Sequence, residues 1–573
     1  MGAIAGLFHP ATPKPVDPAR LRAMVMTMAH RGPDGAGEWT APGVGFAHRR
    51  LATVGGAGAR QPVATPDLRY AAMLDGTILN HDALREELLA SGQAIAGGGD
   101  AEVVLHGFAA WGPALLDRLE GAFAIVVHDA ATQTLFLARD RLGAKPLHYA
   151  VLPDGALAFA SELKGLLAHP LLRRAPDAAA IDDYLALGHV PDDACVIAGV
   201  QKLPAAHFLL VERGRGWRAP RRWWHMRDGA PSASDALLPE IRAAVARTTA
   251  GAIPGALLLG DAADAAVVAL LAEASAKAVR TVAVDEAAAG VAARFATAHR
   301  IVAVGDMAAS LSALVAAFDE PVAAAEAIVA LPAARGARCD GAVAMAGTGA
   351  ALVMGGSRWR GFAQRERVRR AGWLPRWGAT LLGTAEGDHG TASGMPPRGV
   401  RNDVWSVEGR RMLADHRPEA RFAAWLTKGD PLDAAMRADL AIRLPAEALT
   451  IADRAGMAAG VEWRAPFADH RLVTFIQHLP RAIRCAKVSP LSVALARHLP
   501  PMPVGAPASP IGAWLRGPAG EAIARSRLLV ELGWFDLDRI ARLVAEHRAG
   551  QADHQMLLWR LLVLERSLSR LFG

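Results

Sequence analysis

The stretch Ala256-Leu257-Leu258-Leu259-Gly260-Asp261-Ala262-Ala263-Asp264-Ala265-Ala266 decides how the second half of the chain folds. Its four apolar residues predict a short buried strand, and the glycine predicts a turn into a helix that continues through Val267–Glu273. Further strand-like and helical runs alternate along the chain; the strands are expected at Arg280–Val284 and Ala342–Met345, and the helices at Ala265–Lys277, Ala287–His299 and Met307–Phe318. This alternation indicates a parallel sheet covered by helices.

The first ~200 residues differ, because they read as many short strands separated by turns. Gly121–Asp129 is a buried apolar run, and Thr134–Ala138 predicts a second strand. Gly143 and Pro146 mark the turn before a third strand at Leu147–Val151. At the other end, the pattern beyond Ala434 is helical, and the Gly- and Pro-rich residues from about 383 to 403 predict a flexible insertion.

Length and composition favour a globular protein with several domains. The chain has 573 residues, of which 52% are hydrophobic and 21% charged, enough for two to four cores. The most apolar stretch, Gly255–Leu271, contains two aspartates and is therefore not expected to span a membrane. No secretory signal is visible at the first residues. Cys195, Cys339 and Cys485 are isolated, which predicts a reducing cytoplasm and no disulfide framework.

The formal net charge is +7, with basic clusters at Arg358–Arg370 and Arg213–Arg222. Such clusters could contact nucleic acid or acidic membranes, or they could form a solvated arginine-rich face. Because no nucleic-acid-binding module accompanies the charge, we expect the second alternative, with neither a nucleic-acid nor a membrane partner.

Four N-terminal segments share their order and spacing with a known family. They are His30-Arg31-Gly32-Pro33-Asp34, Ala47–Leu51, Ala138–Leu147 and Phe159–Lys164. Together they resemble the class II glutamine amidotransferase domain of asparagine synthetases. The resemblance extends over nearly the whole chain. It implies an N-terminal four-layer α/β/β/α domain at residues 1–205, followed at 235–573 by an asparagine synthetase-like domain with the parallel sheet of adenine-nucleotide α-hydrolases.

The resemblance places Gly2 where the family has its nucleophilic cysteine, and glycine has no side chain with which to form a thioester. The family's N-G-E segment, which donates to the oxyanion, is here Asp75-Gly76-Thr77, and an ionised Asp75 would oppose the developing negative charge. Arg50 and Asp100 occupy the places that bind the glutamine carboxylate and amino groups. Their alternative role is to hold loops together.

The second half resembles the ATP-pyrophosphatase domain of the same family, whose S-G-G-x-D-S-S loop cradles pyrophosphate. The three serine positions are here Gly260, Ala265 and Ala266, Asp261 replaces the first loop glycine, and Asp264 keeps the metal-binding position. An extra carboxylate at this place is expected to weaken phosphate binding.

The family's second signature, S-G-[DE]-G-x-D-E, aligns with Ala346–Ser357. That segment keeps Gly347 and Gly349 and has lost every carboxylate ligand for Mg²⁺. The family also has a phosphate-binding lysine, which aligns with the segment Met502–Pro507. This chain has Val504 at that position, so the cation is missing. Scaffold motifs are retained at Asp319–Pro321, Asp453–Ala458 and Glu462–Leu472, where we expect structural ion pairs.

Three functions remain open from the sequence. The first is a catalytically impaired pseudoenzyme that acts as a partner or regulatory subunit, as a homodimer or in a hetero-complex with an active paralogue. The second is an ATP-dependent amide ligase that makes asparagine from aspartate with ammonia or glutamine, using the ATP and Mg²⁺ that the resemblance implies. The third is an amino-acid sensor that binds through Arg50 and Asp100.

Overall fold

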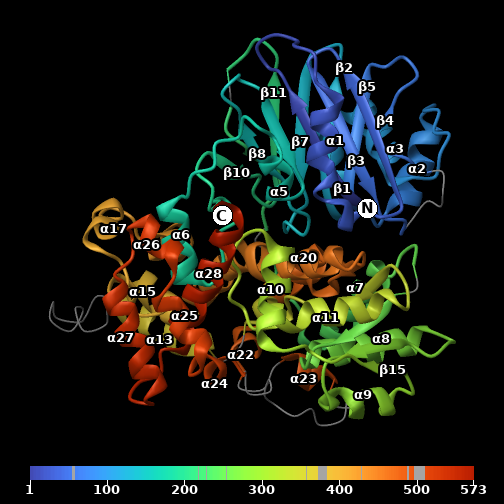
Figure 1. The fold of residues 1–573 in the computed structure, drawn as a ribbon. Helices are drawn as coiled ribbons and strands as arrows, with labels where there is room; N and C mark the ends of the chain where they lie inside the picture. The colour runs from blue at the N-terminus through green and yellow to red at the C-terminus, as the bar shows by residue number, and fades with distance from the viewer. Residues whose placement is uncertain are drawn as a thin grey trace.

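A computed structural model describes residues 1–53, 59–216, 218–226, 229–252, 254–355, 358–371, 384–427, 429–486, 490–495 and 510–572. Two antiparallel sheets form the N-terminal half, and a parallel sheet with many helices forms the remainder (Figure 1). Among the described residues, no helix is long and apolar enough to cross a membrane. The mixed architecture confirms the predicted fold class.

The first sheet is built around β1 (Gly2–Phe8), all of whose residues are buried. This strand runs antiparallel to β3 on one side and β9 on the other. The order is β10-β8-β9-β1-β3-β2, with β2 at Gly35–Ala41, β3 at Val44–Arg50, β8 at His148–Val151, β9 at Leu157–Ala160 and β10 at Val200–Lys202.

The second sheet is built around the long pair β5 (Tyr70–Ile78) and β6 (Gly121–Asp129). Its order is β12-β11-β7-β6-β5-β4, with β4 at Val63–Ala64, β7 at Thr134–Arg139, β11 at His207–Glu212 and β12 at Arg221–Arg222. Because β11 pairs with β7, this sheet continues past the boundary at residue 205 that the sequence predicted.

The two sheets pack face to face and each carries helices on its outer side. Phe8, Phe46, Phe159 and Leu137 belong to the apolar layer between the sheets. Helices α1 (Pro18–Met26) and α5 (Leu163–Leu167) cover the first sheet, and α2 (His81–Ala90) and α3 (Asp100–Trp111) cover the second. This arrangement is the expected four-layer α/β/β/α sandwich, since each sheet must bury both of its faces.

The C-terminal half contains the predicted parallel sheet, with the order β15-β14-β13-β16-β17. The strands are β13 at Gly255–Leu258, β14 at Arg280–Ala283, β15 at Ala298–Ile301, β16 at Val343–Met345 and β17 at Glu462–Arg464. Leu257 and Val282 face α10 (Met307–Phe318), α11 (Glu326–Arg338) and α20 (Thr450–Ala458). Ala256 and Leu258 face α7 (Leu237–Thr248) and α8 (Ala262–Ala274).

The two edges of this sheet differ from the prediction. The helix expected at Ala287–His299 is only α9 (Ala289–Arg294), and the edge strand β15 follows it. The opposite edge strand β17 lies in the region expected to be all helical. Its three residues are too few to show a strand pattern, and two of them are charged. Tertiary contacts, chiefly the pairing with β16, hold it as a strand.

The residues expected to form a flexible insertion are partly helical. Residue 383 lies outside the described residues, but α15 (Ala385–Ala392) and α16 (Arg398–Asn402) occupy much of the remainder. Thr384 caps α15, and His389 stacks on Trp359 with ring centroids 4.7 Å apart. Aromatic packing of this kind orders a segment whose composition alone predicts a loop.

The arginine-rich helix α13 (Arg358–Arg370) is held inside the fold by ion pairs. Arg358 pairs with Asp439 at 2.6 Å and Arg367 with Asp430 at 3.0 Å, both outside the helix, and Arg370 pairs with Glu366 of the same helix at 2.7 Å. These cations therefore have partners within the chain.

Candidate functional site

Gly2 lies opposite Arg50 in the register between β1 and β3. Its N–H donates to Asp75 Oδ1 at 3.2 Å, and its carbonyl oxygen accepts from Arg31 Nε at 2.9 Å. A Cβ added to this residue would overlap the carbonyl oxygen of Arg49. The backbone at this position is therefore built for glycine, and a cysteine does not fit it without a shift of the sheet.

Asp75 lies on β5 with its carboxylate fully buried. Its Oδ2 accepts from Arg31 Nη2 and from Ser161 Oγ, both at 2.9 Å. The sequence predicted a negative charge here but not the arginine that balances it. Gly76 permits close pairing with β6, since a Cβ there would overlap the carbonyl oxygen of Ala122. Both oxygens of Asp75 thus accept hydrogen bonds from groups of the chain itself.

The structure brings Arg50 and Asp100 to one small cavity, together with Met1, Arg60 and Glu102. Its volume is about 20 Å³, which is room for about one water molecule. Asp100 is already engaged, because its Oδ2 accepts from the N–H of Ile78 at 3.0 Å and its Oδ1 lies 2.8 Å from His81 Nδ1. The hydrogen bond to Asp100 raises the pKa of His81.

The loop before α8 presents a carboxylate at the helix N-terminus. Asp261 is the N-cap residue, and its Oδ1 accepts from the N–H of Ala263 at 3.1 Å. Gly260 adopts a φ of +98° and so permits the turn into the helix. A helix N-terminus attracts anions such as phosphate. Here the chain supplies the anion itself.

Asp264 is buried one turn into α8, and both of its carboxylate oxygens accept backbone hydrogen bonds. Oδ2 accepts from Leu259 at 2.8 Å and Oδ1 from Gly347 at 2.7 Å. Burial, and to a smaller extent the nearby Asp261, raise the pKa of this carboxyl group to about 7. The residue predicted as a metal ligand therefore joins two loops.

The second nucleotide signature packs directly against this loop. A Cβ on Gly347 would overlap the Cβ of Ala263, and Gly349 starts α12 (Ala350–Met354) with a φ of +82°. Between them, Thr348 Oγ1 accepts from the indole Nε1 of Trp463 at 3.0 Å. Gly356, Ser357 and the 502–507 segment lie outside the described residues.

Several side chains that the resemblance implies for MgATP binding are absent from this region. Hydroxyl groups are missing from the loop at Gly260, Ala265 and Ala266, and Asp261 places a negative charge where phosphates would lie. In the part of the chain that the structure describes, no group of three or more His, Cys, Asp or Glu side chains is arranged to hold a metal ion. Mg²⁺ requires several oxygen ligands in a regular shell.

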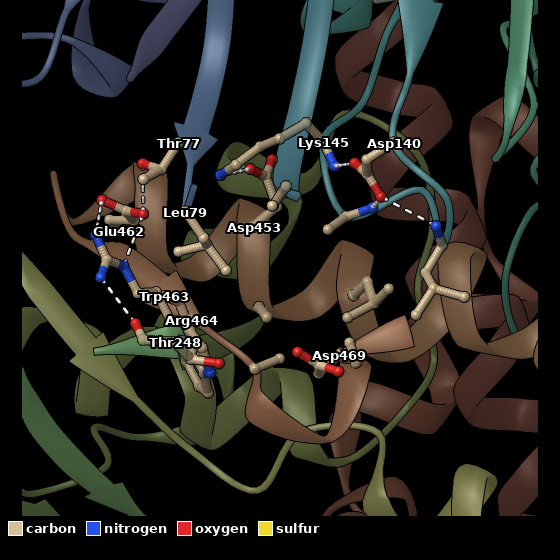
Figure 2. A pocket seen from close by; sticks show the side chains of 18 of the residues that line it. Thr77, Leu79, Asp140, Lys145, Thr248, Asp453, Glu462, Trp463, Arg464 and Asp469 are labelled. Atoms are coloured by element: carbon tan, nitrogen blue, oxygen red, sulfur yellow. Dashed lines mark hydrogen bonds and ion pairs between the residues drawn. The ribbon is translucent and has the colours of Figure 1, made fainter. Parts of the chain in front are cut away.

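A cavity of about 90 Å³ lies between the two halves of the molecule (Figure 2). Figure 2 shows residues of both halves around it: Thr77, Leu79, Asp140 and Lys145 from the N-terminal half, and Thr248, Asp453, Glu462, Trp463, Arg464 and Asp469 from the C-terminal half. This volume is room for several water molecules. The sequence did not predict the cavity, because its walls come from distant segments.

The charged groups around this cavity are paired with one another. Lys145 Nζ lies 2.8 Å from Asp453 Oδ1, and Glu462 Oε1 accepts from Thr77 Oγ1 at 2.8 Å and from Arg464 Nε at 2.9 Å. Burial alone would raise the pKa of Glu462, but Arg464 lowers it to about 2. These charged groups of the cavity wall are therefore paired within the chain, beside apolar residues such as Leu79, Leu142 and Ala452.

Comparison with known proteins identifies both halves. Residues 1–224 match the glutamine amidotransferase domain, and residues 237–569 match asparagine synthase. These matches define a two-domain protein of the amidotransferase class. The chain belongs to the asparagine synthase family, because the second match covers more than half of it.

The relatives differ in how much of the chain they share. A putative asparagine synthetase (glutamine-hydrolyzing) of Mycobacterium tuberculosis is 29% identical over 613 aligned positions, covering 94% of this chain and 91% of that protein. Asparagine synthetase (glutamine-hydrolyzing) 3 of Bacillus subtilis is 35% identical over 194 residues, covering 33% of this chain and 31% of that protein. The similarity to the mycobacterial relative thus spans both halves.

Proposed function

We propose that this chain is a catalytically impaired member of the asparagine synthase family that acts as a partner or regulatory subunit. The observation that carries the proposal is the Asp261 carboxylate, which caps α8 at the place where the family binds pyrophosphate. An anion covalently fixed there competes with any phosphate for the same backbone N–H groups. Gly2 and Asp75 support the same conclusion for the N-terminal half.

The proposed setting is a homodimer, or a hetero-complex with an active paralogue, in the cytoplasm. The free cysteines support a reducing compartment, since Cys195 and Cys485 are buried as thiols and Cys339 is exposed. In such a complex, the active subunit would bind the glutamine, aspartate and MgATP that the family uses.

The second candidate is an active ligase in which aspartate, ATP and ammonia, free or from glutamine, give asparagine, AMP and pyrophosphate. It is favoured by the names of relatives that match over the whole length and by the interdomain cavity of about 90 Å³. In an active ligase, MgATP would have to bind through backbone groups alone, and the Asp261 side chain would have to move away from the N-terminus of α8.

The third candidate is an amino-acid sensor. It is favoured by the shared cavity of Arg50 and Asp100, which bear the charges complementary to an amino acid. The cavity of about 20 Å³ would have to open for a ligand of that size. Glutamine-dependent thermal stabilisation of the wild-type protein, absent in Asp100→Asn, would support this candidate.

The deciding experiment is calorimetric titration of the purified full chain with MgATP, with and without aspartate. We expect no saturable heat up to millimolar ATP. Saturable, Mg²⁺-dependent binding in the micromolar range would contradict the pseudoenzyme proposal and favour the ligase. The same titration of Asp261→Asn is the matched comparison, because this variant keeps a capping group on α8 but removes the negative charge.

A further inference from the structure

A group of buried charged side chains joins the two halves of the molecule, and we call it the ionic joint. It consists of four cations and four anions, which are Arg31, Lys145, Lys164 and Arg454 with Asp75, Glu162, Asp319 and Asp453. Five of these residues lie in the N-terminal half. Asp319, Asp453 and Arg454 lie in the C-terminal half, so the contacts cross the domain boundary.

Arg31 is the centre of the joint, and its guanidinium is completely buried. It contacts Asp75 at 2.9 Å and Glu162 at 2.9 Å within its own half, and Asp453 of α20 at 2.7 Å in the other half. Burial opposes its charge, but the three carboxylates raise the pKa of Arg31 well above its usual range. Asp75 and Asp453 thus hold one cation from opposite sides of the boundary.

The remaining pairs repeat this pattern across the boundary. Lys145 lies 2.8 Å from Asp453, Arg454 lies 2.7 Å from Glu162, and Lys164 lies 3.0 Å from Asp319. Four cations therefore face four anions in a region with little access to water. A buried ion pair that loses one partner leaves an uncompensated charge, which is strongly destabilising.

We propose that Asp75, at the position of the oxyanion-binding asparagine in the family resemblance, acts as the fourth counter-charge of the ionic joint and so holds the two halves together. With asparagine at this position the joint would carry one uncompensated positive charge. The former oxyanion position would then have exchanged a catalytic role for interdomain cohesion. This inference does not depend on the proposed function, because the joint would hold an active or an inactive chain together in the same way.

The test is Asp75→Asn in the full chain, followed by calorimetric unfolding and by hydrogen exchange read out on α20. We expect Tm to fall by about 2–4 °C and amide exchange to rise on α20, which belongs to the other half. The matched control is Asp129→Asn, a buried aspartate of the same sheet whose ion-pair partner is the half-exposed Arg69. It should leave exchange on α20 unchanged.

A second variant separates the charge from the hydrogen bonds of Asp75. Arg31→Gln removes the cation that Asp75 contacts, while Asp453 keeps Lys145 and Glu162 keeps Arg454 as partners. The double variant Asp75→Asn/Arg31→Gln therefore restores equal numbers of charges. We expect the double variant to recover at least half of the Tm lost by Asp75→Asn. Unchanged stability and α20 exchange in Asp75→Asn would overturn the proposal. So would a double variant that is no more stable than Asp75→Asn alone.

Discussion

Asp264 Oδ1 accepts a hydrogen bond from the backbone N–H of Gly347 at 2.7 Å, although 83 positions separate the two residues. The contact joins the loop after β13 to the loop after β16, the two segments that form the nucleotide site in the resembling family. Because Asp264 also accepts from Leu259, the loops are held by the chain's own groups. A ligand entering this place would have to compete with those contacts.

The first prediction concerns Asp261 as the cap of α8. We expect Asp261→Ala to lower the free energy of unfolding by about 1 kcal/mol, and Asp261→Asn to cost a few tenths at most, because asparagine caps nearly as well. Urea denaturation followed by circular dichroism measures both. Asp306→Ala is the positive control for the loss of a cap, because Asp306 caps α10 by accepting from the N–H groups of Ala308 and Ala309, both at 2.9 Å. An Asp261→Ala protein as stable as the wild type would contradict the capping role.

The second prediction concerns the glycine at the nucleophile position. Gly2→Ala should lower stability by about 1–3 kcal/mol, because the added Cβ overlaps the carbonyl oxygen of Arg49 and the sheet must shift. Gly290→Ala is the control, since a Cβ there meets nothing within 4 Å and lies in helix α9. That change should be neutral or stabilising by about 0.5–1 kcal/mol.

The same geometry predicts the outcome of restoring the family's residues. Gly2→Cys combined with Asp75→Asn should release no glutamate from glutamine above background. The cysteine has no room on the present backbone, and Arg31 loses one of its anions. Measurable glutamine hydrolysis by this double variant would show that the site can still assemble.

The third prediction is a pH dependence centred on His416. Its Nε2 lies 2.9 Å from Asp183 Oδ1, and this hydrogen bond raises the pKa of His416 while burial opposes the shift. A raised folded-state pKa adds stability that is fully present below the unfolded pKa of about 6.5 and is lost as pH rises through the folded value.

This dependence is measured as the Tm difference between the wild type and His416→Gln from pH 5.5 to 8.5. The Tm of the wild type should exceed that of the variant most at pH 5.5, and this difference should shrink toward pH 8.5. Arg421 and Asp182 also face this group, and neither is changed by the substitution. A Tm difference that does not vary with pH would show that protonation of His416 is not linked to folding stability.

The fourth prediction uses the interdomain cavity. Ala452 of α20 lines it, so Ala452→Val should find room and change the free energy of unfolding by less than about 1 kcal/mol. Ala455 lies on the same helix, is fully buried and does not line the cavity. Ala455→Val should therefore cost about 1–3 kcal/mol through overpacking. Equal losses in the two variants, measured by denaturant unfolding, would show that the cavity closes in solution.

Most of the fold could be predicted from local patterns. The strands around Gly121–Asp129 and Ala256–Leu259 and the helix Met307–Phe318 were found because each carries a strong apolar run of the right length. The edge strands β15 and β17 were missed. They are short and partly charged, so their pairing partners rather than their own residues define them.

The sequence by itself determined the family and the two-domain architecture. It also determined that Gly2 carries no side chain and that Gly260, Ala265 and Ala266 carry no hydroxyl groups, because this depends only on which residue stands at a position. Only the tertiary structure decided what the replacements do. Asp75 balances Arg31, Asp261 caps α8, and Asp264 links two loops. Arg31 and Asp75 are 44 positions apart, and Asp264 and Gly347 are 83 apart. Burial makes these two pairings important, since an unpaired charge or donor in the interior is costly.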